Sequence, residues 1–140
     1  MQLNKALTAG AVGGIVMAIY DYLVHGMLLK SQYAAIEGFK QGEELGAPFW
    51  FPVVTIVMGL VAGILFAKTR GSWESGAKGG MMFGLWIGLL GGFAAFFSPL
   101  MIKGFPYAMA WYSLVVQVIG WMIYGAVAGS MYKVEETASA

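Results

Sequence analysis

The sequence has no cysteine, a single histidine and few charged residues. Charged side chains make up 11% of its 140 residues, whereas soluble domains usually carry about 25%. With 59% hydrophobic residues, a chain of this size has too much apolar surface to bury in water. The lack of cysteine excludes disulfides, a thiol nucleophile and thiolate metal ligands. A net charge of +1 gives no basic surface for nucleic acid. These absences indicate a membrane protein.

Four apolar segments are long enough to cross a bilayer, which takes roughly 20 apolar residues. They cover residues 7–29, 49–67, 77–102 and 108–132. The sequence therefore predicts an all-α membrane protein with four transmembrane helices in one integral domain, residues 1–140. Its first partner is the lipid bilayer.

Lysine and arginine divide unevenly between the two sides of these segments. One side carries Lys5, Lys68, Arg70, Lys78 and Lys133, and the other carries Lys30, Lys40 and Lys103. Because positive residues near span ends favour the cytoplasmic side, both termini are predicted to be cytoplasmic. The loop 30–48 then faces outward, and its Tyr33, Ile36 and Phe39 suit a short interfacial helix.

A shift of 66 residues aligns the two halves of the chain. It places the run 10–14 (GAVGG) on 76–80 (GAKGG), and the run 59–63 (GLVAG) on 125–129 (GAVAG). Each unit, residues 5–70 and 71–136, is then a helical hairpin. Because each unit holds an even number of spans, the two have the same orientation. The prediction is a parallel two-plus-two repeat.

Small residues recur at every fourth position of each segment, the spacing that lets helices pack closely in lipid. The third segment has five glycines in such a ladder. The predicted packing glycines are Gly10, Gly14, Gly59, Gly63, Gly76, Gly80, Gly84, Gly88, Gly92, Gly125 and Gly129. These faces can pack within one bundle, and one of them can also form an interface with another chain.

Polar side chains lie on the same helix faces. Asp21 is the only acid well inside a segment, and at about 100° per residue Asp21 and His25 share the small-residue arc of the first segment. We expect one polar cluster in the outward half of the bundle. Its predicted members are Asp21, His25, Thr55, Ser98, Ser113, Gln117 and Tyr124.

Four roles are compatible with this cluster. It can be an ion pair and hydrogen-bond set that fixes helix register, or a path for protons or cations. It can also be a pocket for a lipid, a quinone or another amphipathic ligand. A haem held between two chains, each giving His25, is the fourth role. One histidine per chain cannot make a His-rich metal site, and no metal and no cofactor are predicted.

The residues do not match the common enzyme sites. Ser98 and Ser113 have no organised base beyond His25. The glycines lie inside apolar segments rather than between a strand and a helix, so their spacing does not indicate a nucleotide site. We therefore expect a protein that is not an enzyme.

The run from Asp21 to Leu29 (DYLVHGMLL), followed by Tyr33, resembles the end of the first span in a broad set of bacterial membrane proteins. The glycine-rich third segment and the fourth segment with Trp111 extend the likeness. Those proteins have four spans, and their function is unknown. The resemblance implies an integral protein of a bacterial cytoplasmic membrane and carries no established activity.

Three hypotheses for function remain open. The glycine ladder favours a non-catalytic accessory or interaction subunit, or a homo-oligomeric bundle. Asp21 and His25 favour a small transporter or channel for a proton, a cation or a small solute. The third hypothesis is a membrane module that binds lipid, quinone or haem.

Overall fold

The computed structural model describes residues 1–40 and 49–133, and every regular element in these ranges is helical. The long helices are α1 (Leu3–Leu23), α3 (Trp50–Lys68), α4 (Gly76–Gly92) and α6 (Tyr107–Met131). Shorter pieces are a π-helical turn (Val24–Leu28), α2 (Lys30–Ala34), 3₁₀ turns (Arg70–Ser72 and Phe93–Phe96) and α5 (Phe97–Met101). The predicted all-α class is confirmed.

Within the described residues, four helical stretches are long and apolar enough to cross a membrane, as the sequence predicts. They are Leu3–Leu28, Trp50–Lys68, Gly76–Met101 and Tyr107–Met131. Their ends lie within about one helical turn of the predicted limits. Of the predicted interfacial helix, α2 contains Tyr33, and Ile36 and Phe39 follow in turns. The remainder of that loop, 41–48, and the tail, 134–140, lie outside the described residues.

The first and third spans are not regular α-helices to their ends. α1 gives way to the π-helical turn at Val24, and α4 gives way to a 3₁₀ turn at Phe93. Both turns change the number of residues per helical turn. The predicted place of Ser98 on the glycine face assumes an unbroken α-helix, and this 3₁₀ turn interrupts it.

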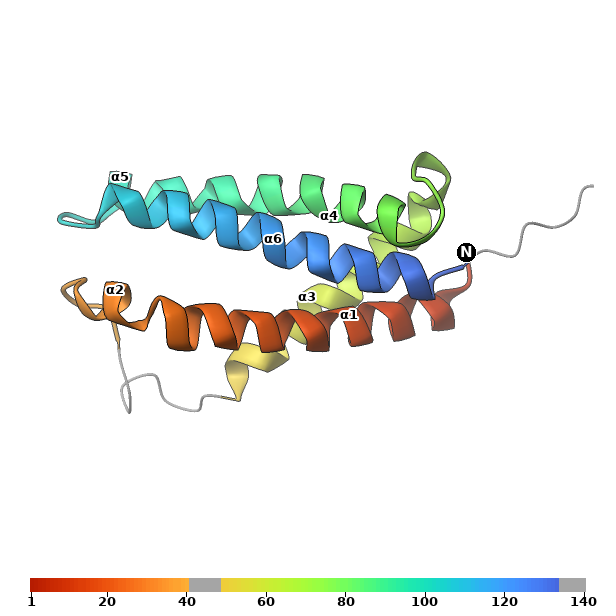
Figure 1. Ribbon diagram of the computed structural model, residues 1–140, viewed down its shortest axis with the longest axis horizontal. Helices are drawn as coiled ribbons and strands as arrows, with labels where there is room; N and C mark the ends of the chain where they lie inside the picture. Colours follow the sequence, from red (N-terminus) through yellow and green to blue (C-terminus); the bar gives the residue numbers. More distant parts are fainter. Residues whose placement is uncertain (41–48, 134–140) are drawn as a thin grey trace, which may run out of the picture.

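The long helices form two antiparallel hairpins (Figure 1). α1 packs against α3, α4 packs against α6, and α1 with α6 provides the main contact between hairpins. α1 and α4 run in one direction, and α3 and α6 run in the other. The beginning of α1 and the end of α6 therefore meet, and the backbone N–H of Gln2 donates to the Tyr132 hydroxyl at 3.2 Å. We call this the termini end, and the opposite end, with α2 and α5, the α2 end.

Glycines bring α1 and α3 into backbone contact. A β-carbon built on Gly10 would lie 2.6 Å from the carbonyl oxygen of Gly59. A β-carbon on Gly63 would lie 2.6 Å from the carbonyl oxygen of Ala6. Distances this short require something to shift, so the crossing depends on the missing side chains. Gly14, one turn further along α1, packs against α3 in the same way.

α4 and α6 are also in backbone contact. A β-carbon on Gly80 would collide with the carbonyl oxygen of Gly125, and one on Gly84 would collide with that of Trp121. The glycines at this crossing are Gly80, Gly84, Gly88, Gly92, Gly125 and Gly129. Gly76 differs from them, because a β-carbon there would meet nothing within 4 Å. Its φ of +78° explains the glycine instead.

The two crossings repeat one pattern of contacts. Gly63 packs on Gly10 in the first hairpin, and Gly129 packs on Gly80 in the second. Gly63 and Gly129 are 66 residues apart, but Gly10 and Gly80 are 70 apart. By these contacts, a position in α1 corresponds to the position 70 residues later in α4. The sequence alignment pairs it with the position 66 residues later, which is about one helical turn earlier in α4. The duplication itself stays a prediction.

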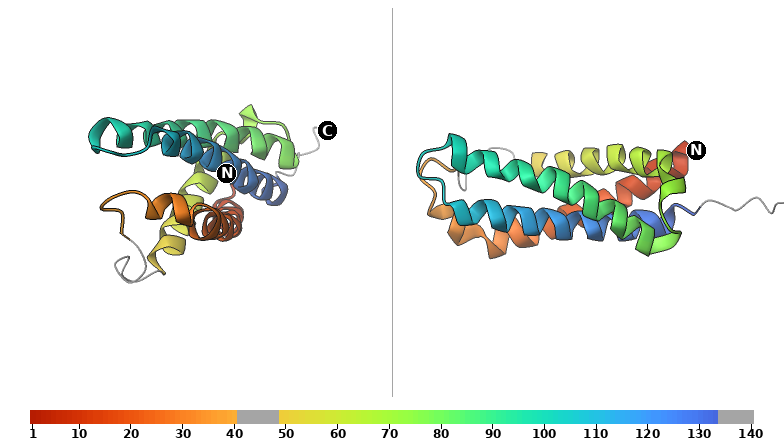
Figure 2. Two further views of the ribbon diagram at one scale, coloured as in Figure 1. Left: turned by 60° about the vertical axis from the view of Figure 1, so that its left-hand side comes forward. Right: turned by 90° about the horizontal axis from the view of Figure 1, so that it is seen from above.

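Aromatic and small side chains form a core that occupies the termini half of the bundle. The ring of Phe66 lies 5.1 Å from that of Phe83 and 6.3 Å from that of Tyr132. The core consists of Ala6, Ala9, Met17, Ala62, Phe66, Ala67, Phe83, Trp121, Tyr124, Ala128 and Tyr132. All four long helices contribute to it. Towards the α2 end the hairpins diverge, and the beginning of α3 lies apart from α4 and α5 in both Figure 1 and Figure 2.

Candidate polar site at the α2 end

Asp21 lies in the last turn of α1, where α1 faces α3. Its side chain is half-buried, and Thr55 Oγ1 of α3 donates a hydrogen bond of 3.3 Å to Oδ2. The same hydroxyl lies 3.2 Å from the carbonyl oxygen of Phe51, so its one proton has two competing acceptors. A carboxylate can accept several hydrogen bonds. Among the described residues Asp21 accepts only this long one, so most of its acceptor capacity is open.

His25 lies in the π-helical turn that follows α1. The backbone N–H of Leu29 donates to the carbonyl oxygen of Val24 at 2.8 Å, which is the i to i+5 bond of a π-helix. The histidine is half-buried, one turn beyond Asp21. The two side chains form no ion pair. The one ion pair among the described residues joins Lys78 and Glu74, at the other end of the bundle.

Tyr33 of α2 folds back over this turn. Its hydroxyl lies 2.6 Å from Nδ1 of His25, in a hydrogen bond whose donor depends on the imidazole tautomer. Its ring stacks on Phe39 at 4.8 Å, and the neighbouring Ile36 is buried. Burial, and then the nearby negative charge of Asp21, raise the pKa of Tyr33 above its ordinary value. The segment after α1 therefore covers the polar site from the α2 end.

Tyr20, next to Asp21, ties the site to the second hairpin. Its hydroxyl donates to the carbonyl oxygen of Val116 on α6 at 3.1 Å. A β-carbon on Gly120 would lie 2.9 Å from its ring, so glycine makes room for it. Tyr20 and Tyr33 are not among the predicted members of the polar cluster. Tyr33 belongs to the predicted interfacial helix and to the run that resembles bacterial membrane proteins, and neither signal indicates a partner.

The structure brings together three of the seven predicted members of the cluster, Asp21, His25 and Thr55. Tyr124 lies elsewhere, fully buried in the aromatic core, where its hydroxyl donates to the carbonyl oxygen of Gly59 at 2.6 Å. The side chains of Ser98, Ser113 and Gln117 are half-buried and form no hydrogen bond with the described residues. The predicted single cluster is thus a smaller site on α1, the π-helical turn, α2 and α3.

The titratable groups of this smaller site are one carboxylate and one imidazole. Within the described ranges, no group of three histidine, cysteine or acidic residues could hold a metal ion. An open carboxylate accepts a proton or attracts a cation, and a histidine four residues away adds a second titratable group. On the side towards the termini, the aromatic core closes the way through the bundle.

Comparisons of the chain with protein-family models, with curated proteins and with solved structures give no match.

Proposed function

We propose that this protein is a small, non-catalytic membrane carrier that binds a proton or a small cation at Asp21. The observation behind the proposal is the state of that carboxylate. It is the only acid in the four spans, it is half-buried, and its single hydrogen bond among the described residues is 3.3 Å long. Charged groups in spans are costly, and they usually mark ion or proton pathways.

The arrangement of the bundle supports a carrier rather than an open channel. Phe66, Phe83 and Trp121 belong to a packed core between the polar site and the termini end. A channel needs a continuous polar path, and this core interrupts it. A carrier instead exposes one site to each side in turn, and Asp21, in the last turn of α1, lies nearer the α2 end.

A flux experiment in liposomes tests the proposal. The protein is reconstituted with a pH-sensitive dye inside, and proton flux is followed after a proton, Na⁺ or K⁺ gradient is imposed. We expect wild-type protein to support flux with one of these ions, and Asp21→Asn to lower it at least tenfold because the neutral amide binds no cation. Glu74→Gln, which neutralises an exposed acid at the termini end, is the matched control and should keep wild-type flux. Full activity in Asp21→Asn would refute the proposal.

The accessory or homo-oligomeric role has less support from the structure. The glycine ladder favours that role, but its glycines other than Gly76 pack between helices of the same chain. An interface with another chain would need a different surface, so this role stays a prediction. The same holds for a haem, quinone or lipid at the polar site.

A further inference from the structure

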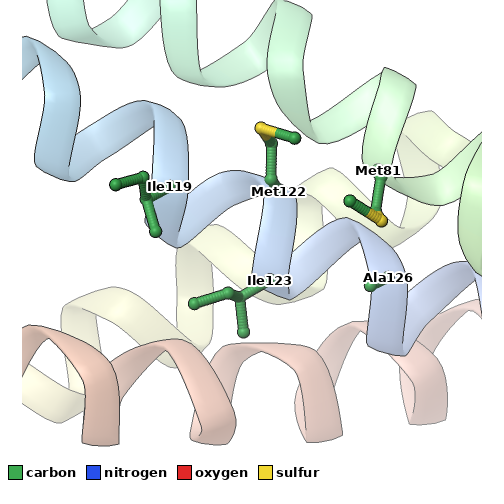
Figure 3. A pocket seen from close by; sticks show the side chains of 5 residues that line it. All are labelled: Met81, Ile119, Met122, Ile123 and Ala126. Carbon is green, nitrogen blue, oxygen red and sulfur yellow. The ribbon is translucent and has the colours of Figure 1, made fainter.

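Two shallow hollows lie along α6, away from the polar site. The first is at the termini end, between the beginning of α1 and the end of α6. It is lined by Asn4, Lys5, Thr8 and Met131. The second is entirely apolar and lies further along α6, beside α4. It is lined by Met81, Ile119, Met122, Ile123 and Ala126, which Figure 3 shows on one face of the bundle.

The two hollows lie at different depths in the membrane. Lys5 is in the first turn of the first span, and Met131 is the last residue of α6. Ile123 is eight residues before Met131, which places it about 12 Å deeper at 1.5 Å per residue. The first hollow is therefore at the level of lipid headgroups, and the second is at the level of acyl chains.

Among the described residues, the charge at the termini end is positive. The described basic residues there are Lys5, Lys68, Arg70, Lys78 and Lys133, and the acid among them, Glu74, is paired with Lys78 at 2.9 Å. Lys5 has neither an ion pair nor a side-chain hydrogen bond within the described residues. The Thr8 hydroxyl donates to the Asn4 carbonyl oxygen at 2.9 Å. The Lys5 ammonium and the Asn4 side-chain amide are thus the donors open to a ligand.

We propose that the two hollows together bind an anionic phospholipid. Its phosphate lies against Lys5 and Asn4, and one acyl chain follows α6 past Ile123 and Ala126. Basic pockets between membrane helices bind anionic headgroups through this charge complementarity. The acyl chain of the lipid fills the apolar hollow, which no side chain of the protein occupies. The site is independent of Asp21, which lies at the opposite end of the bundle.

Native mass spectrometry tests the proposal. The protein is reconstituted in nanodiscs of mixed phosphatidylglycerol and phosphatidylcholine, and the lipids retained on release are counted. We expect wild-type protein to retain phosphatidylglycerol preferentially. Lys5→Gln should lower that retention about five-fold, the effect of one lysine at a membrane surface, and Lys5→Arg should keep it. Ala126→Phe, which fills the apolar hollow, should lower retention of both lipids.

Lys68→Gln is the matched control. Lys68 ends α3 at the same end of the bundle and lines neither hollow, so its removal lowers the net charge equally without touching the site. Circular dichroism of each variant checks the fold. Equal losses in Lys5→Gln and Lys68→Gln would show diffuse attraction and overturn the proposal. Equal retention of the two lipids by wild-type protein, or unchanged retention in Ala126→Phe, would overturn it as well.

Discussion

Tyr33 reports on the charge of Asp21 from just beyond the first span. Because burial and that charge raise the Tyr33 pKa above its ordinary 10.0, the folded protein favours the neutral phenol. Its contribution to stability is present below pH 10 and is lost as the pH rises through the higher folded value. In Asp21→Asn the Tyr33 pKa should fall, as measured by NMR titration of labelled tyrosine, while Glu74→Gln should leave it unchanged. An unchanged pKa in Asp21→Asn would contradict a charged Asp21 beside Tyr33.

Single residues also show where inference from the sequence fails. Tyr124 and Gln117 share one arc of α6, which gives the direction of their side chains but not their depth in the bundle. Seven residues along α6 separate the two by about 10 Å. Tyr124 therefore bonds to Gly59 in the core and not to the polar site. The contact of Tyr33 with His25 follows from a π-helical turn and a chain reversal. Neither of these has a sequence pattern that periodicity detects.

At the scale of elements, the glycines of α4 differ in what they contact. Gly80 faces the backbone of α6, whereas a β-carbon on Gly91 would meet nothing within 4 Å. Gly80→Ala should therefore destabilise the bundle by about 2 kcal/mol through overpacking. Gly91→Ala, the matched control on the same helix, should be neutral or stabilise by about 0.5 kcal/mol. Thermal unfolding in detergent, followed by circular dichroism, measures both. Equal stabilities would contradict the assigned crossing.

The helices themselves could be predicted because membrane helices have a strong sequence signal. Runs of about 20 apolar residues locate each span, and chain order pairs neighbours into hairpins. Regular spacing also identified the glycine faces. This spacing did not fix how α4 aligns along α6 in the second hairpin. A helix with a glycine at every fourth position can pack on its partner equally well when it is shifted by one turn. In the contacts, Asp21 corresponds to Gly91 rather than Ile87, and either alignment leaves Asp21 as the single acid of the four spans.

At the scale of the whole molecule, the two ends differ in what they can bind. Among the described residues, the termini end has the aromatic core and a surplus of cations, which suit packing and an anionic lipid. The α2 end has diverging hairpins, Asp21 with open acceptor capacity, and Tyr33 above it. The aromatic core closes the Asp21 site towards the termini end, and the segment with Tyr33 covers it at the α2 end.

Infrared difference spectroscopy on reconstituted protein addresses Asp21 itself. Spectra of wild-type protein minus those of Asp21→Asn isolate the carboxyl band of this one residue across a pH series, with and without Na⁺ or K⁺. We expect a band that converts from carboxylic acid to carboxylate as the pH rises, and a conversion point that shifts when the transported cation is added. A band that responds to neither pH nor cations would mean that Asp21 is a sealed structural group, and the proposed carrier function would be wrong.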